Sequence, residues 1–182
     1  LLLSNVYNRM IRTAFYTTQK ELDGILPDVM PEEKVLADAK KAVLELAEKL
    51  EANGAPKVVV NDLARCDMAE AIEDAFRYPN IILATTTYNA DIFPFMREFI
   101  DHLTQRNFQN HTVALIENGS WAPLAAKVMK DMLANSKNIT YTDNSVKILS
   151  ALNEDSSKQL NALAEELCKE YIAAQDDKAN KN

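Results

Sequence analysis

The most constraining feature of this chain is a series of short, largely apolar runs that alternate with amphipathic segments from Lys57 onward. The runs cover residues 58–60, 81–84, 112–116 and 146–149. Apolar runs of this length are typical of strands buried on both faces, as in a parallel sheet. The alternation of strand and helix predicts right-handed βαβ crossovers, and therefore an α/β fold with an open parallel sheet and helices on both faces.

Helical patterns separate the runs. Asp67, followed by Glu70, predicts an N-cap, while Pro94 and Pro123 each predict the first turn of a helix. A long amphipathic stripe spans residues 34–53 and the last one spans residues 160–171. We therefore assign residues 34–174 to one α/β domain and the polar residues 175–182 to a disordered tail.

Residues 1–33 fit two patterns. Apolar residues at helical spacing between Leu3 and Ile25 favour a helix, whereas residues 14–18 suit a strand. We prefer the helix, because Arg12 and the polar ends of this stretch are poor for a buried strand. Residues 1–33 are thus predicted to form an atypical, helical N-terminal segment.

Composition excludes several classes of function. The net charge of −7 argues against nucleic acid as a partner, because phosphates would be repelled. No stretch of about 18 apolar residues is present, so we expect no membrane span. Cys66 and Cys168 stand apart from each other and from the two histidines, so we expect no metal site. Two lone thiols and an acidic chain suit a cytoplasmic protein.

Two stretches after predicted strands carry groups that could bind a ligand, and ligands of such sheets bind beyond the carboxyl ends of the strands. The first stretch follows residues 81–84 and offers hydroxyl, aromatic and amide groups before Pro94: Thr85, Thr86, Thr87, Tyr88 and Asn89. Such a loop can donate to an anion or a heterocycle. Ordinary helix capping, with Asp91 as the cap, explains the same composition equally well.

The second stretch follows residues 112–116 and includes Asn118, Gly119, Ser120 and Trp121. Gly119 permits a positive φ or a close approach to a ligand. Trp121 is the only tryptophan and could stack on a planar ring. The alternative is that Trp121 closes one end of the core.

Together, residues 84–94 (ATTTYNADIFP) and 117–123 (ENGSWAP) resemble the two flavin-contacting loops in the flavodoxin-like domain of A-type flavoproteins, the flavodiiron family. The resemblance implies a flavodoxin-like fold, bound FMN, and electron transfer to a redox protein partner with no side chain acting as acid or base. Hydroxyl and backbone donors would come from residues 85–87, and Trp121 would stack on the ring. The cofactor-binding residues that it implies are Thr85, Thr86, Thr87, Tyr88, Asn89, Asn118, Gly119, Ser120 and Trp121.

The chain departs from this family where the FMN phosphate should bind. The expected phosphate loop falls at residues 31–38, which contain three acidic residues and no Gly, Ser or Thr. In one interpretation, residues 14–18 form a displaced first strand and phosphate binding is weakened. In the other, which we prefer, the first strand is missing, and the exposed edges predict a homodimer or a swapped assembly. The diiron half of the family is also absent, because His102 and His111 are the only histidines.

Three functions remain open. The leading hypothesis is an FMN-binding electron-transfer domain. The alternative is a degenerate flavodoxin-like module without flavin that serves as a structural or protein-interaction domain. A small reductase that uses free flavin is a third interpretation, and no residue separates it from the first.

Overall fold

The computed structural model describes the backbone of residues 11–16, 33–119, 123–149 and 151–179, and the side chains within residues 39–119, 123–149 and 151–169. The strands are β1 (Ile11–Tyr16), β2 (Lys57–Asp62), β3 (Asn80–Tyr88), β4 (Asp91–Ile92), β5 (His111–Gly119), β6 (Ile139–Tyr141) and β7 (Val146–Leu149). The helices are α2 (Glu33–Ala52), α3 (Met68–Arg77), α4 (Pro94–Gln105), α5 (Ala125–Met132) and α6 (Glu154–Ala179).

The sheet is open and almost entirely parallel, with the strand order β2-β1-β3-β5-β6. The short β4 folds back on the end of β3 as an antiparallel hairpin. The last strand position is split, because β6 pairs with the beginning of β5 and β7 pairs with its end. The predicted open parallel sheet is therefore confirmed.

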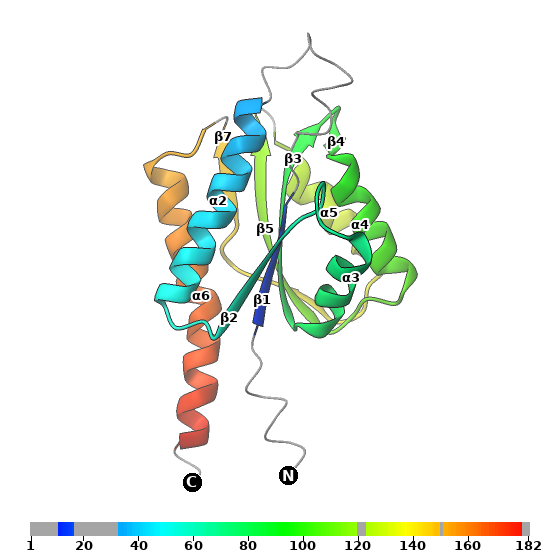
Figure 1. Cartoon of the computed structure of the whole chain (residues 1–182). Coiled ribbons are helices and arrows are strands. Elements are labelled where there is room, and N and C mark those ends of the chain that lie inside the picture. The colour runs from blue at the N-terminus through cyan, green and yellow to red at the C-terminus, as the bar shows by residue number, and fades with distance from the viewer. Residues whose placement is uncertain (1–10, 17–32, 120–122, 150, 180–182) are drawn as a thin grey trace.

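Helices cover both faces of this sheet, as Figure 1 shows. One core lies under α2 and α6 and includes Ile82 and Ala84 of β3. The other lies under α3, α4 and α5 and includes Ile81 and Leu83 of the same strand. Successive side chains of a strand point to opposite faces, so a run such as 81–84 must be apolar throughout when both faces are covered.

The first strand is present and lies inside the sheet, between β2 and β3. Thr13 of β1 lies opposite Val59 of β2 and Ile81 of β3. The prediction of a helix is therefore wrong for residues 11–16, while residues 1–10 and 17–32 lie outside the described residues. Pairing on both sides satisfies the backbone of β1, and this tertiary pairing outweighs the helical spacing of its apolar residues. Because the strand is present, a missing strand gives no reason to expect a dimer.

Helix starts follow the predicted signals closely. Asp67 caps α3, since its carboxylate accepts a hydrogen bond from Ala69 N at 2.7 Å. Pro94 is the first residue of α4, and Pro123 lies two residues before the start of α5. The stripe predicted over residues 34–53 corresponds to α2, one residue earlier at each end.

The C-terminal tail differs from its prediction. Helix α6 continues to Ala179, so residues 175–179 are helical rather than disordered, and residues 180–182 lie outside the described part of the chain. Residues 173–179 include Ala, Gln and Lys, which are good helix formers. Adding such residues to an existing helix is favourable, because the cost of nucleation has already been met.

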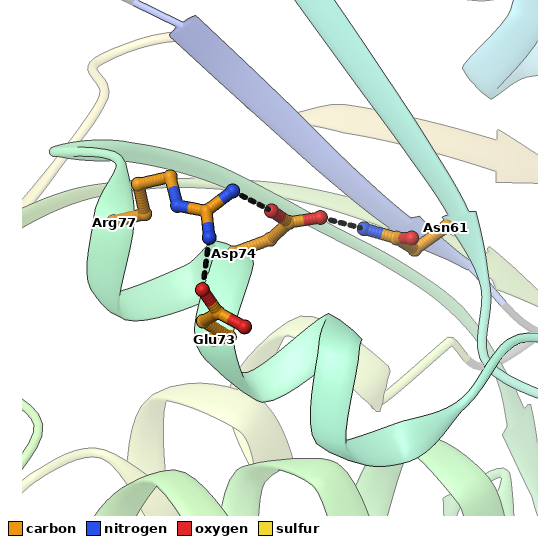
Figure 2. A network of polar contacts seen from close by, with 4 residues as sticks. All are labelled: Asn61, Glu73, Asp74 and Arg77. Atoms are coloured by element: carbon orange, nitrogen blue, oxygen red, sulfur yellow. Dashed lines mark hydrogen bonds and ion pairs between the residues drawn. The ribbon is translucent and has the colours of Figure 1, made fainter.

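A polar network fixes α3 beside β2 (Figure 2). The Asn61 amide on β2 donates to a carboxylate oxygen of Asp74 on α3 at 3.3 Å. Arg77 extends the network by pairing with both Asp74 and Glu73. Exposed ion pairs of this kind add little stability, so their contribution is chiefly to orientation. No helix in the described part of the chain is both long and apolar enough to cross a membrane.

Candidate functional site

The two predicted ligand-binding stretches meet at one edge of the sheet. Thr85 lies opposite Glu117 and Thr86 lies opposite Asn118, at the carboxyl ends of the neighbouring strands β3 and β5. This is the upper edge in Figure 1. The crossover from β1 runs through α2 on one face, whereas the crossover from β3 runs through α4 on the other. Ligands of such sheets bind at this reversal, between the carboxyl ends of β1 and β3.

Thr86 and Asn118 tie the two strand ends together. The Thr86 hydroxyl donates to the main-chain oxygen of Asn118 at 3.2 Å. Thr86 is 5% exposed and Asn118 is fully buried, so both side chains lie inside the domain. They face the core under α2 and α6, two residues beyond Ala84 and Ile116. Their predicted role toward a flavin would therefore have to come from their backbone.

Thr87 points to the opposite face and contacts α5. Its hydroxyl oxygen accepts hydrogen bonds from Leu124 N at 2.8 Å and from Ala125 N at 3.2 Å. Glu117, on the same face, accepts from Ala126 N at 3.0 Å. The first amides of a helix have no partner within the helix, and here two strand ends supply one. The amides of residues 124–126 are therefore already bonded and do not offer a site for an anion.

The buried hydroxyl of Thr85 has no hydrogen-bond partner in the described part of the chain. The residue is 2% exposed, and its Oγ1 makes no hydrogen bond within the described residues. Leaving a buried hydroxyl unpaired costs about 1–3 kcal/mol. The hydroxyl lies at the carboxyl edge, where a ligand or a water molecule could satisfy it. Thr85 is the predicted threonine whose side chain makes no hydrogen bond within the described residues.

Tyr88 and Asn89 lie at the surface, where β3 turns into β4. Asn89 and Ala90 both have positive φ, 49° and 59°, which is the geometry of a type I′ hairpin turn. The ring of Tyr88 packs edge-on against Phe93, with centroids 5.7 Å apart. Tyr88 and Asn89 also line a groove of about 590 Å³ that continues along α4. Both residues are accessible to a ligand.

Asp91 is not the cap of α4. Phe93 precedes the helix, and the Asp91 carboxylate instead accepts from Ile92 N at 2.8 Å and pairs with Arg97. The hydrogen bond from Arg97 lowers the pKa of Asp91. The capping explanation for this loop is therefore wrong for Asp91.

Gly119 makes a close approach, but to its own chain. A Cβ at this position would lie 3.0 Å from Cα of Pro123, and the φ of Gly119 is not in the left-handed region. Ser120 and Trp121 lie outside the described residues. Nor does any group of three or more His, Cys, Asp or Glu side chains in the described ranges form a metal site.

Comparison with solved structures decides the fold. The chain superposes on rubredoxin oxygen oxidoreductase from Desulfovibrio gigas with a TM-score of 0.74 and 16% identity, covering 91% of this chain and 37% of that one. A flavodoxin from the domain Archaea gives a TM-score of 0.66 at 15% identity and covers 90% and 99%. This chain has the flavodoxin-like fold. Its predicted resemblance to flavodiiron proteins is confirmed at the level of the fold.

A third structure adds to this likeness. The flavodiiron core from Synechocystis gives a TM-score of 0.72 at 8% identity, covering 91% of this chain and 36% of that one. The flavodoxin-like chain thus spans little more than a third of the oxidoreductase and of the flavodiiron core. No protein-family model and no curated protein matches the sequence.

The described residues of this flavodoxin-like edge fit a flavin in part. The unpaired hydroxyl of Thr85, the accessible Tyr88 and Asn89, and the main chain at the ends of β3 and β5 can donate and accept around a planar ring. The side chains of Thr86 and Thr87 are already bonded within the protein. A flavin here would therefore be recognised largely through main-chain groups.

Glu117 is the residue that sequence analysis missed. It lies within the second stretch, yet its contact with Ala126 was not predicted. A signal existed, because Leu124, the residue before α5, has no side-chain acceptor with which to cap a helix. When a helix begins without a capping side chain and the strand before it ends in an acidic residue, that acidic residue can be expected to cap the helix.

Proposed function

We propose that this chain is a flavodoxin-like electron-transfer domain that binds FMN at the carboxyl edge of β1, β3 and β5. The observation that carries the proposal is the meeting of two distant stretches, both resembling flavin loops, at the carboxyl ends of β3 and β5, next to the point where the sheet's crossovers reverse. Thr85 lies opposite Glu117 and Thr86 lies opposite Asn118 at that edge. The fold of the structural neighbours supports the same location.

Each residue at the edge has a defined task in this proposal. The Thr85 hydroxyl and the main chain of residues 86–89 and 118–119 hold the ring, Tyr88 and Asn89 border it, and Ser120 and Trp121 complete the second side. The flavin supplies transfer of one or two electrons, and the protein supplies position and electrostatics. The carboxylate of Glu117 nearby disfavours an anionic reduced ring and so lowers its potential.

The proposal extends to partners and compartment. Electrons would be exchanged with a redox protein, and the net charge of −7 favours a basic one. Cys66 is a free thiol, which suits the reducing cytoplasm. A homodimer remains a separate hypothesis, which light scattering after size exclusion at several concentrations tests directly.

The first test is the visible absorption spectrum of the purified protein before and after addition of FMN, followed by gel filtration. Flavin bands that survive gel filtration support the proposal. Trp121→Ala should weaken retention and change flavin fluorescence, whereas Leu44→Ala, at an exposed site on α2, should do neither. Riboflavin, which lacks the phosphate, measures how much the phosphate contributes. A colourless wild-type protein that retains no FMN would refute the proposal.

The alternative function is a flavodoxin-like module without flavin that binds a protein partner. The observations favouring it are the occupied N-terminus of α5 and the lack of Gly, Ser and Thr in residues 31–38. FMN gains much of its affinity from charge-assisted bonds to its phosphate, each contributing about 1.5–3 kcal/mol. A protein that releases FMN on gel filtration yet remains folded would fit this alternative.

A further inference from the structure

Helix α5 begins without a capping side chain of its own. Its first amides are satisfied instead by the ends of two strands that are distant in sequence. Thr87 of β3 accepts from Leu124 N and Ala125 N, and Glu117 of β5 accepts from Ala126 N. Two side chains therefore hold three consecutive amides.

Glu117 is itself held in place. Its side chain is 13% exposed, and its second carboxylate oxygen lies 3.9 Å from Nζ of Lys147 on β7. The Lys147 side chain is half exposed, so it lies on the solvent side of the Glu117 carboxylate and does not bury it. The contact links β5, β7 and α5 at one point.

The described residues on either side of residues 120–122 make close contacts. Gly119 packs so closely on Pro123 that a Cβ would lie 3.0 Å away. Thr87 and Glu117 hold the amides of residues 124–126. Thr87 also belongs to the strand end that carries Tyr88 and Asn89, so one hydroxyl joins the first predicted flavin-binding stretch to the start of α5.

We infer that Thr87 and Glu117 are positioning residues that hold the start of α5 against the ends of β3 and β5 and thereby set the affinity for flavin. The inference rests on the proposed function. It assigns to Thr87 a role besides any direct donation to flavin, because its hydroxyl oxygen accepts two hydrogen bonds from α5. Affinity depends on such preorganisation, since a loop that must be ordered on binding costs free energy.

The test uses two variants of the full chain and two matched controls. Thr87→Val keeps the shape of the side chain and removes the acceptor, whereas Glu117→Gln keeps an acceptor for Ala126 and removes the charge facing Lys147. Thr104→Val removes a hydroxyl that bonds only within α4, to Asp101 O. Glu166→Gln alters a carboxylate that accepts from the amides of a different loop, residues 143–144.

Two measurements distinguish an effect on the position of the loop from an effect on flavin affinity. The first is the dissociation constant of FMN, which Thr87→Val should raise about fivefold, the effect of losing one typical helix cap. The second is acrylamide quenching of Trp121 in the flavin-free protein. Trp121 is the only tryptophan and lies in the sequence between Gly119 and Pro123, so its quenching reports directly on this connection.

We expect Thr87→Val to increase quenching and weaken FMN binding, Glu117→Gln to do both to a smaller extent, and the two controls to do neither. Circular dichroism must show all four variants folded, and Glu117→Gln, which keeps its acceptor, serves if Thr87→Val does not fold. Weaker FMN binding with unchanged quenching would overturn positioning in favour of direct contact. Greater quenching with unchanged affinity would overturn the link to flavin. If the wild type itself binds no FMN, the proposed function fails, and the quenching still decides whether Thr87 and Glu117 position the connection.

Discussion

The imidazole of His111 stacks on the ring of Phe108, with centroids 4.1 Å apart and planes inclined by 22°. A ring nitrogen of His111 also lies 2.5 Å from the main-chain oxygen of Gln109. His111 begins β5 and is half-buried. Burial lowers its pKa below the ordinary value of 6.5, although the backbone contacts act in the opposite direction.

This lowered pKa predicts a pH-dependent stability. Because the unfolded chain binds a proton at His111 more readily than the folded one, stability should fall as pH drops below about 6.5 and level off below the folded pKa. His111→Gln should remove that fall. Urea unfolding midpoints between about pH 5 and pH 8 measure it. His102→Gln, at the only other histidine, tests whether the effect is specific to His111. Equal slopes in the wild type and His111→Gln would contradict this account.

Ala90 occupies the left-handed region with φ of 59°, next to Asn89 with φ of 49°. The left-handed conformation costs a residue with a Cβ about 1–2 kcal/mol, and glycine avoids this cost while losing more entropy on folding. Ala90→Gly should therefore stabilise the domain by up to about 1 kcal/mol in urea unfolding. Ala69→Gly, at an exposed position of α3, should instead destabilise by about 1 kcal/mol. Destabilisation by Ala90→Gly would show that the turn carries no strain.

Elements buried on both faces could be predicted from sequence because their pattern is local. The runs 81–84 and 113–116 are apolar throughout since each strand has a helical layer on either side. The start of α3 at Asp67 was equally local, since a cap and its helix are adjacent. Such features depend on neighbours within a few residues.

The first strand could not be predicted in the same way. Residues 11–16 lie within a longer stretch that also has helical spacing, and the choice is made by β2 and β3, which are 46 or more residues away in the chain. Pairing with two distant strands is information that a local pattern lacks. The helical spacing of these residues gave the wrong prediction because it contains no information about those partner strands.

The threonines of the first stretch show the same limit in the site. The sequence suggests one shared role for three consecutive hydroxyls. The structure separates them, since Thr86 bonds to β5, Thr87 holds α5, and Thr85 has no partner among the described residues. Alternation along a strand determines the face, but only the position of α5 determines what each hydroxyl meets.

Glu166 predicts a second pH dependence, in acid. Burial alone would raise its pKa. Hydrogen bonds from Asn144 and from Asp143 N together lower the pKa by more than burial raises it, so the net pKa lies below the ordinary 4.5. A lowered carboxylate pKa contributes stability above about pH 4.5, and this is lost as pH falls through the folded pKa. Glu166→Gln should cost about 1 kcal/mol at neutral pH, and its difference from wild type should shrink in acid.

Urea unfolding of both proteins at about pH 7 and pH 3.5 checks this prediction. Glu48→Gln, at an exposed position of α2, serves as the control and should lie within about 0.5 kcal/mol of wild type at both pH values. A difference between Glu166→Gln and wild type that stays constant with pH would show that the charge of Glu166 is not what holds residues 143–144.

Gly119 provides the last prediction, because its approach to Pro123 leaves a side chain less space than an ordinary van der Waals contact needs. A Cβ on residue 119 would lie 3.0 Å from both Cα and Cβ of Pro123. Gly119→Ala should therefore destabilise the domain by about 1–3 kcal/mol, as overpacking does. Pro123→Gly removes one of the two close atoms, so the double variant should lose less than the sum of the single changes. Strict additivity in urea unfolding would show that residue 119 tolerates a methyl group by some other movement, and that the close contact does not fix the connection to α5.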